Sequence, residues 1–233
     1  MIVPKVAPVL VNNNGIPFFV FQIENHKAFS EVFVQHSYNL QKESQQNISY
    51  QGEGTWHSSD NLHLNAKFTQ LKILFNEAIT LLWQMQKCSK TDFEWDYKAL
   101  WVNISKFGDH TFPHAHWGHA GSLFGGVYYP QVPKNSGNLR LFSPDKKLTS
   151  VGGFNLKQLT PFHLPTYIDL EVKSGQVVLF PNWIGHGVLS NKSFKDRISY
   201  TFLAGIKQFP IDDWPQTPEL PNREWDASNS GFE

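Results

Sequence analysis

Short apolar segments follow one another between residues 94 and 207, and turn-forming residues separate them. They are rich in Val, Ile, Phe, Tyr and Trp, and Gly, Pro, Asn and Asp bound them. Their sequences are ALWVNISKF, SLFGGVYYPQV, GNLRLFSP, TYIDLEV, GQVVLFPNWI and RISYTFLAGI. Because β-branched and aromatic residues favour strands and the intervening residues favour turns, the pattern predicts an antiparallel β-sandwich or a barrel-like jelly roll.

The first part of the chain has a helical pattern. Apolar residues recur at three- and four-residue spacing over residues 66–87, which predicts an amphipathic helix. Asn65 is a residue type that favours the N-cap of such a helix. We also expect a shorter helix over residues 25–40, an extended segment over residues 16–23 and a turn-rich loop over residues 41–65.

The length of 233 residues suits one mainly β (α+β) domain, with N-terminal helices packed on a β core. Residues 1–93 would supply helical and extended support, residues 94–207 the β core, and residues 208–233 a proline-rich tail. Hydrophobic residues make up 40% of the chain and aromatic residues 15%. A sizeable core is therefore available, and disorder through the whole chain is not expected.

Composition argues against several classes of protein. The formal net charge is zero without long runs of one sign, which opposes broad electrostatic binding to nucleic acid or to an anionic membrane but leaves a local patch open. The single cysteine, Cys88, can form no internal disulfide and is expected to be a small apolar residue. Neither a signal peptide nor a long apolar span is recognisable, so we expect a cytoplasmic protein. The oligomeric state stays open.

The decapeptide HTFPHAHWGH carries four of the ten histidines of the chain. His114 and His116 are two residues apart, so in an extended strand both project to one side, where they can reach one metal ion. His186 follows a strongly apolar β segment and a Pro-Asn turn, and is the best candidate for a third ligand from a distant strand. His110 and His119 stand beside turn residues and are expected to be solvated. Each histidine alone could equally be structural, and the pair, the β context and the distal residue together indicate a metal site.

One pattern of spacing resembles the cupin barrels. Gly108 precedes His114, and Pro181 precedes His186, at the intervals found in the two cupin motifs. The glutamate ligand of the cupin pattern is missing here, so this resemblance is one of barrel geometry alone.

A second resemblance covers residues 101–202 in ordered blocks. The blocks are WVN (101–103), GDHTFPHAH (108–116), GGVYY (125–129), VPKNSGNLRL (132–141), LFPNWIGHGV (179–188) and RISYTF (197–202), with GTWHSS (54–59) upstream. In this order they resemble the 2-oxoglutarate/Fe(II) oxygenases found in phages and marine bacteria. The resemblance implies a double-stranded β-helix that uses Fe(II), 2-oxoglutarate and O2.

The same resemblance implies iron ligands. His114 matches the first ligand and His186 the distal one, whereas His116 stands where many members of the wider superfamily carry a carboxylate. Three candidates remain for the third ligand: the neutral imidazole of His116, the carboxylate of Asp109 folded back onto the metal, or a water or halide. We favour His116, because strand geometry puts it beside His114. His119 is a weaker alternative, because an apparent insertion of WGHA brings it near the ion.

Candidate residues for 2-oxoglutarate follow from the last block. Arg197 and Ser199 share one face of a strand, and the resemblance implies that they hold the distal carboxylate of 2-oxoglutarate. A guanidinium binds a carboxylate through two parallel hydrogen bonds, and a hydroxyl can donate a third. Tyr128 or Tyr129 is a candidate phenol donor, and Asn103 is a candidate lining residue.

The predicted function is an Fe(II)- and 2-oxoglutarate-dependent dioxygenase that hydroxylates a substrate and releases succinate and CO2. The alternatives are a cupin-type metalloenzyme that uses no 2-oxoglutarate, and a non-catalytic metal- or ligand-binding β-sandwich. The pair Arg197 and Ser199 discriminates the first from the second. A small molecule or a peptide is expected as the substrate, with no nucleic acid or membrane partner indicated. Trp101, Trp117 and Trp183 bracket the motifs and could form an aromatic wall or pack in the core.

Overall fold

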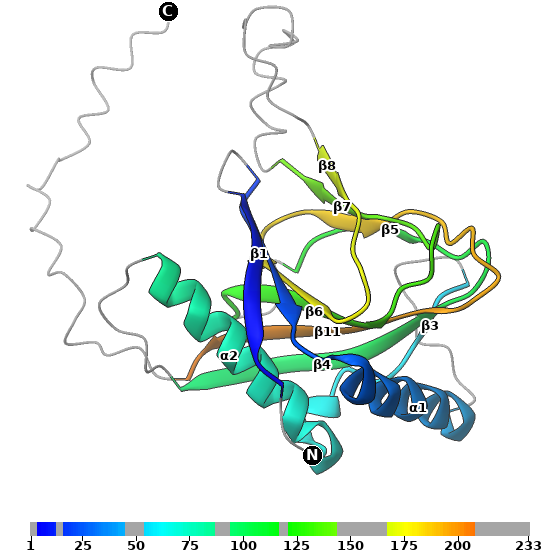
Figure 1. The fold of residues 1–233 in the computed structure, drawn as a ribbon, viewed down its shortest axis with the longest axis horizontal. Helices are drawn as coiled ribbons and strands as arrows, with labels where there is room; N and C mark the ends of the chain where they lie inside the picture. Colours follow the sequence, from blue (N-terminus) through cyan, green and yellow to red (C-terminus); the bar gives the residue numbers. More distant parts are fainter. Residues whose placement is uncertain are drawn as a thin grey trace, which may run out of the picture.

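The computed structural model describes residues 4–12, 16–44, 54–86, 94–116, 121–143 and 167–207. Within these ranges the strands form two antiparallel sheets, and two helices lie against the larger one (Figure 1). The prediction of a mainly β fold with N-terminal helices packed on it is confirmed. Part of the predicted loop (45–53), Cys88, Trp117, His119 and the predicted tail (208–233) lie outside the described residues.

The larger sheet has the strand order β1-β2-β9-β6-β11-β4-β3. The bounds of its strands are β1 Val6–Asn12, β2 Phe18–Ile23, β3 Trp56–His57, β4 Trp95–Ser105, β6 Phe124–Gln131, β9 Gln176–Pro181 and β11 Arg197–Ile206. Strands from the first 93 residues therefore extend the same sheet that the later strands form. Strand β1 was not predicted from the sequence, because Pro8 interrupts its apolar run. It lies at the edge of the sheet, where strands tolerate proline.

The smaller sheet has the order β5-β10-β7-β8. The bounds of its strands are β5 Thr111–His114, β7 Leu139–Phe142, β8 Tyr167–Leu170 and β10 His186–Val188. It stacks on the inner face of the larger sheet, and buried apolar side chains of both sheets fill the space between them. Val127, Val178 and Phe180 from the larger sheet meet Leu139 and Leu141 from the smaller one in this layer.

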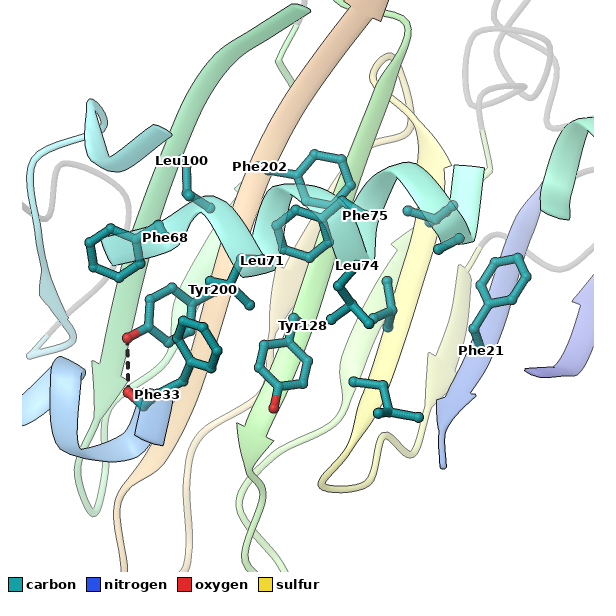
Figure 2. Close-up of a cluster of buried hydrophobic side chains, with 14 of the residues drawn as sticks. Phe21, Phe33, Phe68, Leu71, Leu74, Phe75, Leu100, Tyr128, Tyr200 and Phe202 are labelled. Atoms are coloured by element: carbon teal, nitrogen blue, oxygen red, sulfur yellow. Dashed lines mark hydrogen bonds between the residues drawn. The ribbon is translucent and has the colours of Figure 1, made fainter. Parts of the chain in front are cut away.

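Two helices, α1 (Lys27–Glu43) and α2 (Thr69–Met85), cover the outer face of the larger sheet. The first is the helix predicted from the sequence, displaced by two or three residues. In Figure 2 the apolar side of α2 faces the rings of the sheet, and Phe75 stacks on Phe202 with ring centres 3.9 Å apart. No helix in the described part of the chain combines the length and the apolar character that a membrane span requires.

The second helix begins later than its apolar spacing predicts. A 3-10 helix, Leu62–Leu64, comes first, and Ala66–Phe68 then form another before α2 begins. The side chain of Asn65 accepts a hydrogen bond of 2.9 Å from the backbone N–H of Lys67. Asn65 therefore caps the second 3-10 turn and not α2 itself.

The larger sheet is buried on both faces, and this decides which residues reach the space between the sheets. Successive residues of a strand point to opposite faces. On β11, Tyr200 points to the helices, and its hydroxyl donates a hydrogen bond of 2.8 Å to the backbone carbonyl of Phe33 (Figure 2). Ser199 and Thr201 on either side of it point inward and line a pocket between the sheets.

Candidate metal centre and adjoining pocket

Three imidazoles meet at one end of the space between the sheets. His114 is the last residue of β5, His186 is the first residue of β10, and the two are partners in the antiparallel register. His116 follows β5 by two residues, and its backbone N–H donates to the carbonyl of Asn182 at 3.3 Å. One ring nitrogen from each histidine lies within 4.8 Å of the other two, so the group could hold a metal ion.

Backbone carbonyls orient two of these rings. Nδ1 of His114 donates to the carbonyl of Phe112 at 2.8 Å, and Nδ1 of His186 donates to the carbonyl of Ile184 at 3.0 Å. A neutral ring that donates through Nδ1 keeps the lone pair of Nε2 for another partner. A metal-binding histidine is commonly held in this way, with its second nitrogen fixed by a hydrogen bond.

Burial favours the neutral form of two of these rings. It lowers the pKa of His186 well below the usual value, and repulsion from His114 and His116 adds to the shift. Burial also lowers the pKa of His114, while the hydrogen bond to Phe112 opposes this change. Neutral imidazoles suit a borderline divalent cation such as Fe(II), so the chemistry of this donor set fits the metal that the sequence implied.

A pocket extends from the histidines towards the beginning of β11. Besides His114 and His186, its polar lining comes from Thr55, His57, Asn103, Ser105, Thr111, Tyr129, Arg197, Ser199 and Thr201, and its apolar lining from Trp101, Val127, Leu139 and Val188. Most of the polar side chains belong to the larger sheet, where they alternate with residues that face the helices.

The guanidinium of Arg197 is buried in this pocket, and the residue is only 2% exposed. Nε and Nη2 of Arg197 and the hydroxyl of Tyr129 have no hydrogen-bond partner among the described residues. The guanidinium carbon lies 5.0 Å from the centre of the Tyr129 ring. A buried charge is unfavourable unless it is paired, so these donors fit an anionic group such as a carboxylate.

The pKa values of this pair reflect the same environment. Burial raises the pKa of Tyr129 to about 12, and attraction to Arg197 opposes the change. Burial lowers the pKa of Arg197, and Tyr129 again opposes the change. The tyrosine is therefore protonated near neutral pH, so its hydroxyl can donate a hydrogen bond.

Ser199 and Asn103 lie between Arg197 and the aromatic side of the pocket. They are partners across β11 and β4, and both line the pocket. Nδ2 of Asn103 donates to Oγ1 of Thr201 at 3.3 Å. The strand register thus brings three of the predicted cosubstrate residues into one cavity.

Tyr128 does not belong to this cavity, and its predicted role needs correction. Its hydroxyl is hydrogen-bonded to Oγ of Ser30 on α1 at 2.9 Å, and its ring packs among the helix-facing aromatic side chains in Figure 2. Because neighbours on a strand face opposite ways, Tyr129 is the residue of the pair that lines the pocket. The candidate phenol donor is therefore Tyr129.

Other residues singled out from the sequence lie elsewhere. Asp109 accepts a hydrogen bond of 2.7 Å from the backbone N–H of Lys106 and is not part of the histidine group. The ring of His110 packs edge-on against Phe112, with centres 4.8 Å apart, and lines a separate groove. Trp183 is 44% exposed and does not line the pocket, whereas Trp101 does.

His57 is one of the pocket residues to which the sequence assigned no role. His57 stacks on Trp101 with ring centres 5.3 Å apart, and Trp101 lies edge-on to His116 at 5.7 Å. Together they form an aromatic wall beside the histidine group. His57 belongs to the block GTWHSS, but only the pairing of β3 with β4, which sets His57 opposite Asn103, shows that it reaches the pocket.

Sequence comparison identifies one family. The profile of the family described as "Putative 2OG-Fe(II) oxygenase" matches residues 99–202, which include the three histidines, Arg197 and Ser199. No curated protein sequence matches the chain.

Solved structures share the fold at low sequence identity. A prolyl-4-hydroxylase from Pseudomonas putida has a TM-score of 0.55 and 14% identity, and the match covers 84% of this chain and 95% of that one. HygX from Streptomyces hygroscopicus, solved with nickel and 2-oxoglutarate bound, has a TM-score of 0.58 and 14% identity, with 86% and 89% covered. A prolyl hydroxylase from Trichoplax adhaerens, in complex with a peptide fragment of hypoxia inducible factor, has a TM-score of 0.55 and 15% identity, with 84% and 85% covered. The two antiparallel sheets are thus the double-stranded β-helix that the sequence predicted.

Proposed function

Because the profile of the 2OG-Fe(II) oxygenase family matches residues 99–202, we propose that the chain acts as a member of this family: it oxidises a second substrate with O2 while 2-oxoglutarate is converted to succinate and CO2. The observation that carries this proposal is the sharing of one pocket by His114, His186 and the buried guanidinium of Arg197. A metal site alone would suit many activities. A metal site joined to an enclosed cation suits a cosubstrate that chelates a metal at one end and carries a carboxylate at the other.

His114, His116 and His186 are the proposed ligands of Fe(II). When bound, the iron supplies the redox chemistry with O2 that no side chain can perform. His116 is favoured over Asp109 because the His116 ring nitrogen belongs to the compact group, whereas Asp109 is held by the backbone of Lys106. Three neutral ligands carry one negative charge less than two histidines and a carboxylate, so we expect weaker binding of Fe(II) than at a carboxylate-containing site.

Arg197, Ser199 and Tyr129 are the proposed partners of the distal carboxylate of 2-oxoglutarate. Two N–H groups of the guanidinium can donate to the two carboxylate oxygens, and the hydroxyls of the serine and the tyrosine can donate to their remaining lone pairs. The apolar residues Val127 and Leu139 border the same cavity and limit the access of water to these hydrogen bonds.

Hydroxylation of a C–H bond is the proposed outcome, with a small molecule or a peptide as the substrate. Among the proteins that share the fold, the hydroxylase from Trichoplax adhaerens was solved with a peptide fragment and HygX with hygromycin B, so ligands of both classes occur with this fold. We propose that the wall of His57 and Trp101 contacts the substrate, because it borders the histidine group on the side of Asn103.

The test is the release of succinate from 2-oxoglutarate by the Fe(II)-loaded protein under air. We expect slow succinate formation even without the second substrate, and none under argon or with His186→Ala. In parallel, 2-oxoglutarate should raise the melting temperature of the metal-loaded protein. Binding of the metal without any effect of 2-oxoglutarate would instead support the cupin-type alternative, and 2-oxoglutarate binding without turnover would support a ligand-binding protein.

A further inference from the structure

Three loops come together at one end of the sandwich. They are the loop from β4 to β5 (106–110), the loop from β6 to β7 (132–138) and the loop from β10 to β11 (189–196). The N–H of Gly108 donates to the carbonyl of Asn191 at 2.7 Å, and the N–H of Lys192 donates to the carbonyl of Asn135 at 2.9 Å. The side chain of Asn191 is buried and bonded to the carbonyls of Ser105 and Lys195, so the loops form one ordered unit.

Two phenylalanines project from this unit. Phe107 is 59% exposed and Phe194 is 93% exposed. Their rings are parallel within 6°, with centres 5.1 Å apart, so each covers one face of the other and leaves its second face in solvent. Large apolar side chains that gather on a surface, rather than occurring singly, commonly mark an interaction site.

Lysines surround the two rings. Lys106, Lys134, Lys192 and Lys195 belong to the same three loops, and all four are exposed. The loops contain two carboxylates, and both are engaged: Asp109 accepts from the N–H of Lys106, and Asp196 accepts from the hydroxyl of Tyr38 at 3.0 Å. We call Phe107, Phe194 and the four lysines the Phe-Lys surface. It carries a local positive charge, although the chain as a whole is neutral.

The Phe-Lys surface lies away from the candidate metal centre. β5 leaves the 106–110 loop at Thr111 and reaches the metal group with its last residue, His114; β10 begins at His186 and leads away from it to the 189–196 loop. In Figure 1 these loops form the end of the sandwich on the right of the view. None of the four lysines lines the pocket that holds the histidine group or the groove beside His110. The surface is therefore separate from the pocket of the candidate metal centre.

We propose that the Phe-Lys surface attaches the protein peripherally to an anionic lipid membrane. Apolar rings at the tip of ordered loops can enter the boundary between head groups and acyl chains, and lysines around them attract acidic lipids. A single-stranded nucleic acid would also combine phosphates with stacking bases, but such proteins guide the strand along a basic groove. Phe107 and Phe194 project outward from the loop tips, and this arrangement fits a flat partner better.

The test is sedimentation of the full chain with vesicles of phosphatidylcholine alone and of phosphatidylcholine with phosphatidylserine. We expect binding only to vesicles that contain phosphatidylserine, and release when the salt concentration is raised. The variant Phe107→Ser/Phe194→Ser should lose most of this binding. Lys192→Glu/Lys195→Glu should weaken it by at least about tenfold, since each lysine near an acidic membrane contributes measurably. The four positions are exposed, so these variants should keep the wild-type melting temperature.

Leu64→Ser/Lys173→Glu is the matched control, because Leu64 is 77% exposed and Lys173 is exposed outside the three loops. It should bind vesicles like the wild type. Absence of binding to acidic vesicles, or equal binding by the wild type and both surface variants, would overturn the proposal. So would tight binding to a single-stranded oligonucleotide that the same variants abolish, when vesicles are not bound.

Discussion

His114 and His186 face one another across the antiparallel pair of β5 and β10, with their ring centres 4.4 Å apart. Each donates its Nδ1 proton to the carbonyl two residues earlier in its own chain segment, Phe112 in one case and Ile184 in the other. Strand pairing fixes the distance between the two residues, and the backbone fixes the direction of each ring. The sheet and the two backbone carbonyls therefore define the positions of both rings, which favours precise ligand geometry.

Removal of either of these rings should abolish tight metal binding. We expect His114→Ala and His186→Ala each to weaken Fe(II) binding by more than about 100-fold, because the loss of a direct ligand exceeds the effect of losing a supporting hydrogen bond. Binding is measured by titration under anaerobic conditions, with Co(II) as a spectroscopic substitute. His110→Ala is the control, since His110 lines a different groove, and it should bind like the wild type. Wild-type metal content in His186→Ala would rule out the metal centre described above.

The third ligand can be identified by comparing His116 with Asp109. His116→Ala should weaken metal binding, whereas His116→Asp should restore it or improve it, because a carboxylate adds negative charge at the ligand position. Asp109→Asn should leave metal affinity unchanged, since Asp109 is bonded to the backbone of Lys106. If Asp109→Asn and His116→Ala weaken binding equally, the assignment of His116 is wrong.

The sequence predicted the two sheets well because their strands are rich in β-branched and aromatic residues and end at clear turns. It could also bring His114 and His116 together, since residues two apart in an extended segment project to the same side, although His116 lies two residues beyond the end of β5. It missed β1, whose Pro8 interrupts the pattern. It also placed the start of the second helix too early, because the three-residue 3-10 turn before α2 is too short to show a period that differs from that of an α-helix.

The sequence left the choice between Tyr128 and Tyr129 open, because it does not reveal which face of β6 points to the pocket. Both faces of the larger sheet are buried, one by the helices and one by the smaller sheet, so β6 has no polar side to reveal which residues face the pocket. The neighbouring strand would have settled it: Tyr129 shares the inner face with Ser199, and Tyr128 pairs with Tyr200 on the helix side. His57 was missed for a related reason, because its two-residue strand is too short to show a period.

Arg197 should determine the affinity for 2-oxoglutarate. Arg197→Gln removes the charge, and Arg197→Lys keeps it but loses the paired N–H groups that match a carboxylate. We expect the KM for 2-oxoglutarate to rise by roughly 10- to 100-fold in Arg197→Gln, which corresponds to the loss of one charged hydrogen-bonded contact. Arg140→Gln is the control, because Arg140 pairs with Asp169 on β8 and lines the groove beside His110 and not the pocket of Arg197. Equal KM values for the wild type and Arg197→Gln would show that Arg197 does not bind 2-oxoglutarate.

The adjacent tyrosines offer a matched pair of variants. Tyr129→Phe should raise the KM for 2-oxoglutarate a few-fold and leave the melting temperature nearly unchanged, because the hydroxyl has no partner among the described residues. Tyr128→Phe should leave the KM unchanged and lower the free energy of unfolding by about 1 kcal/mol, because it removes the hydrogen bond to Ser30. Steady-state kinetics and urea unfolding measure the two effects. The opposite result, with Tyr128→Phe changing the KM, would contradict the orientation of β6.

Acid should destabilise the metal-free protein through its buried histidines. Burial lowers the pKa values of His57, His114 and His186 below the usual value of 6.5. Below pH 6.5 these histidines therefore become protonated in the unfolded chain but stay neutral in the folded chain. As a result, the free energy of unfolding falls as the pH falls, until the pKa of the folded state is reached. Each such histidine contributes a slope of about 1.4 kcal/mol per pH unit.

Urea unfolding in the presence of a chelator should show this fall in the free energy of unfolding below pH 6.5 and a plateau above it. His186→Asn removes one of the three groups and should give a shallower slope than the wild type, and an equal or steeper slope would show that His186 is not held neutral by the fold.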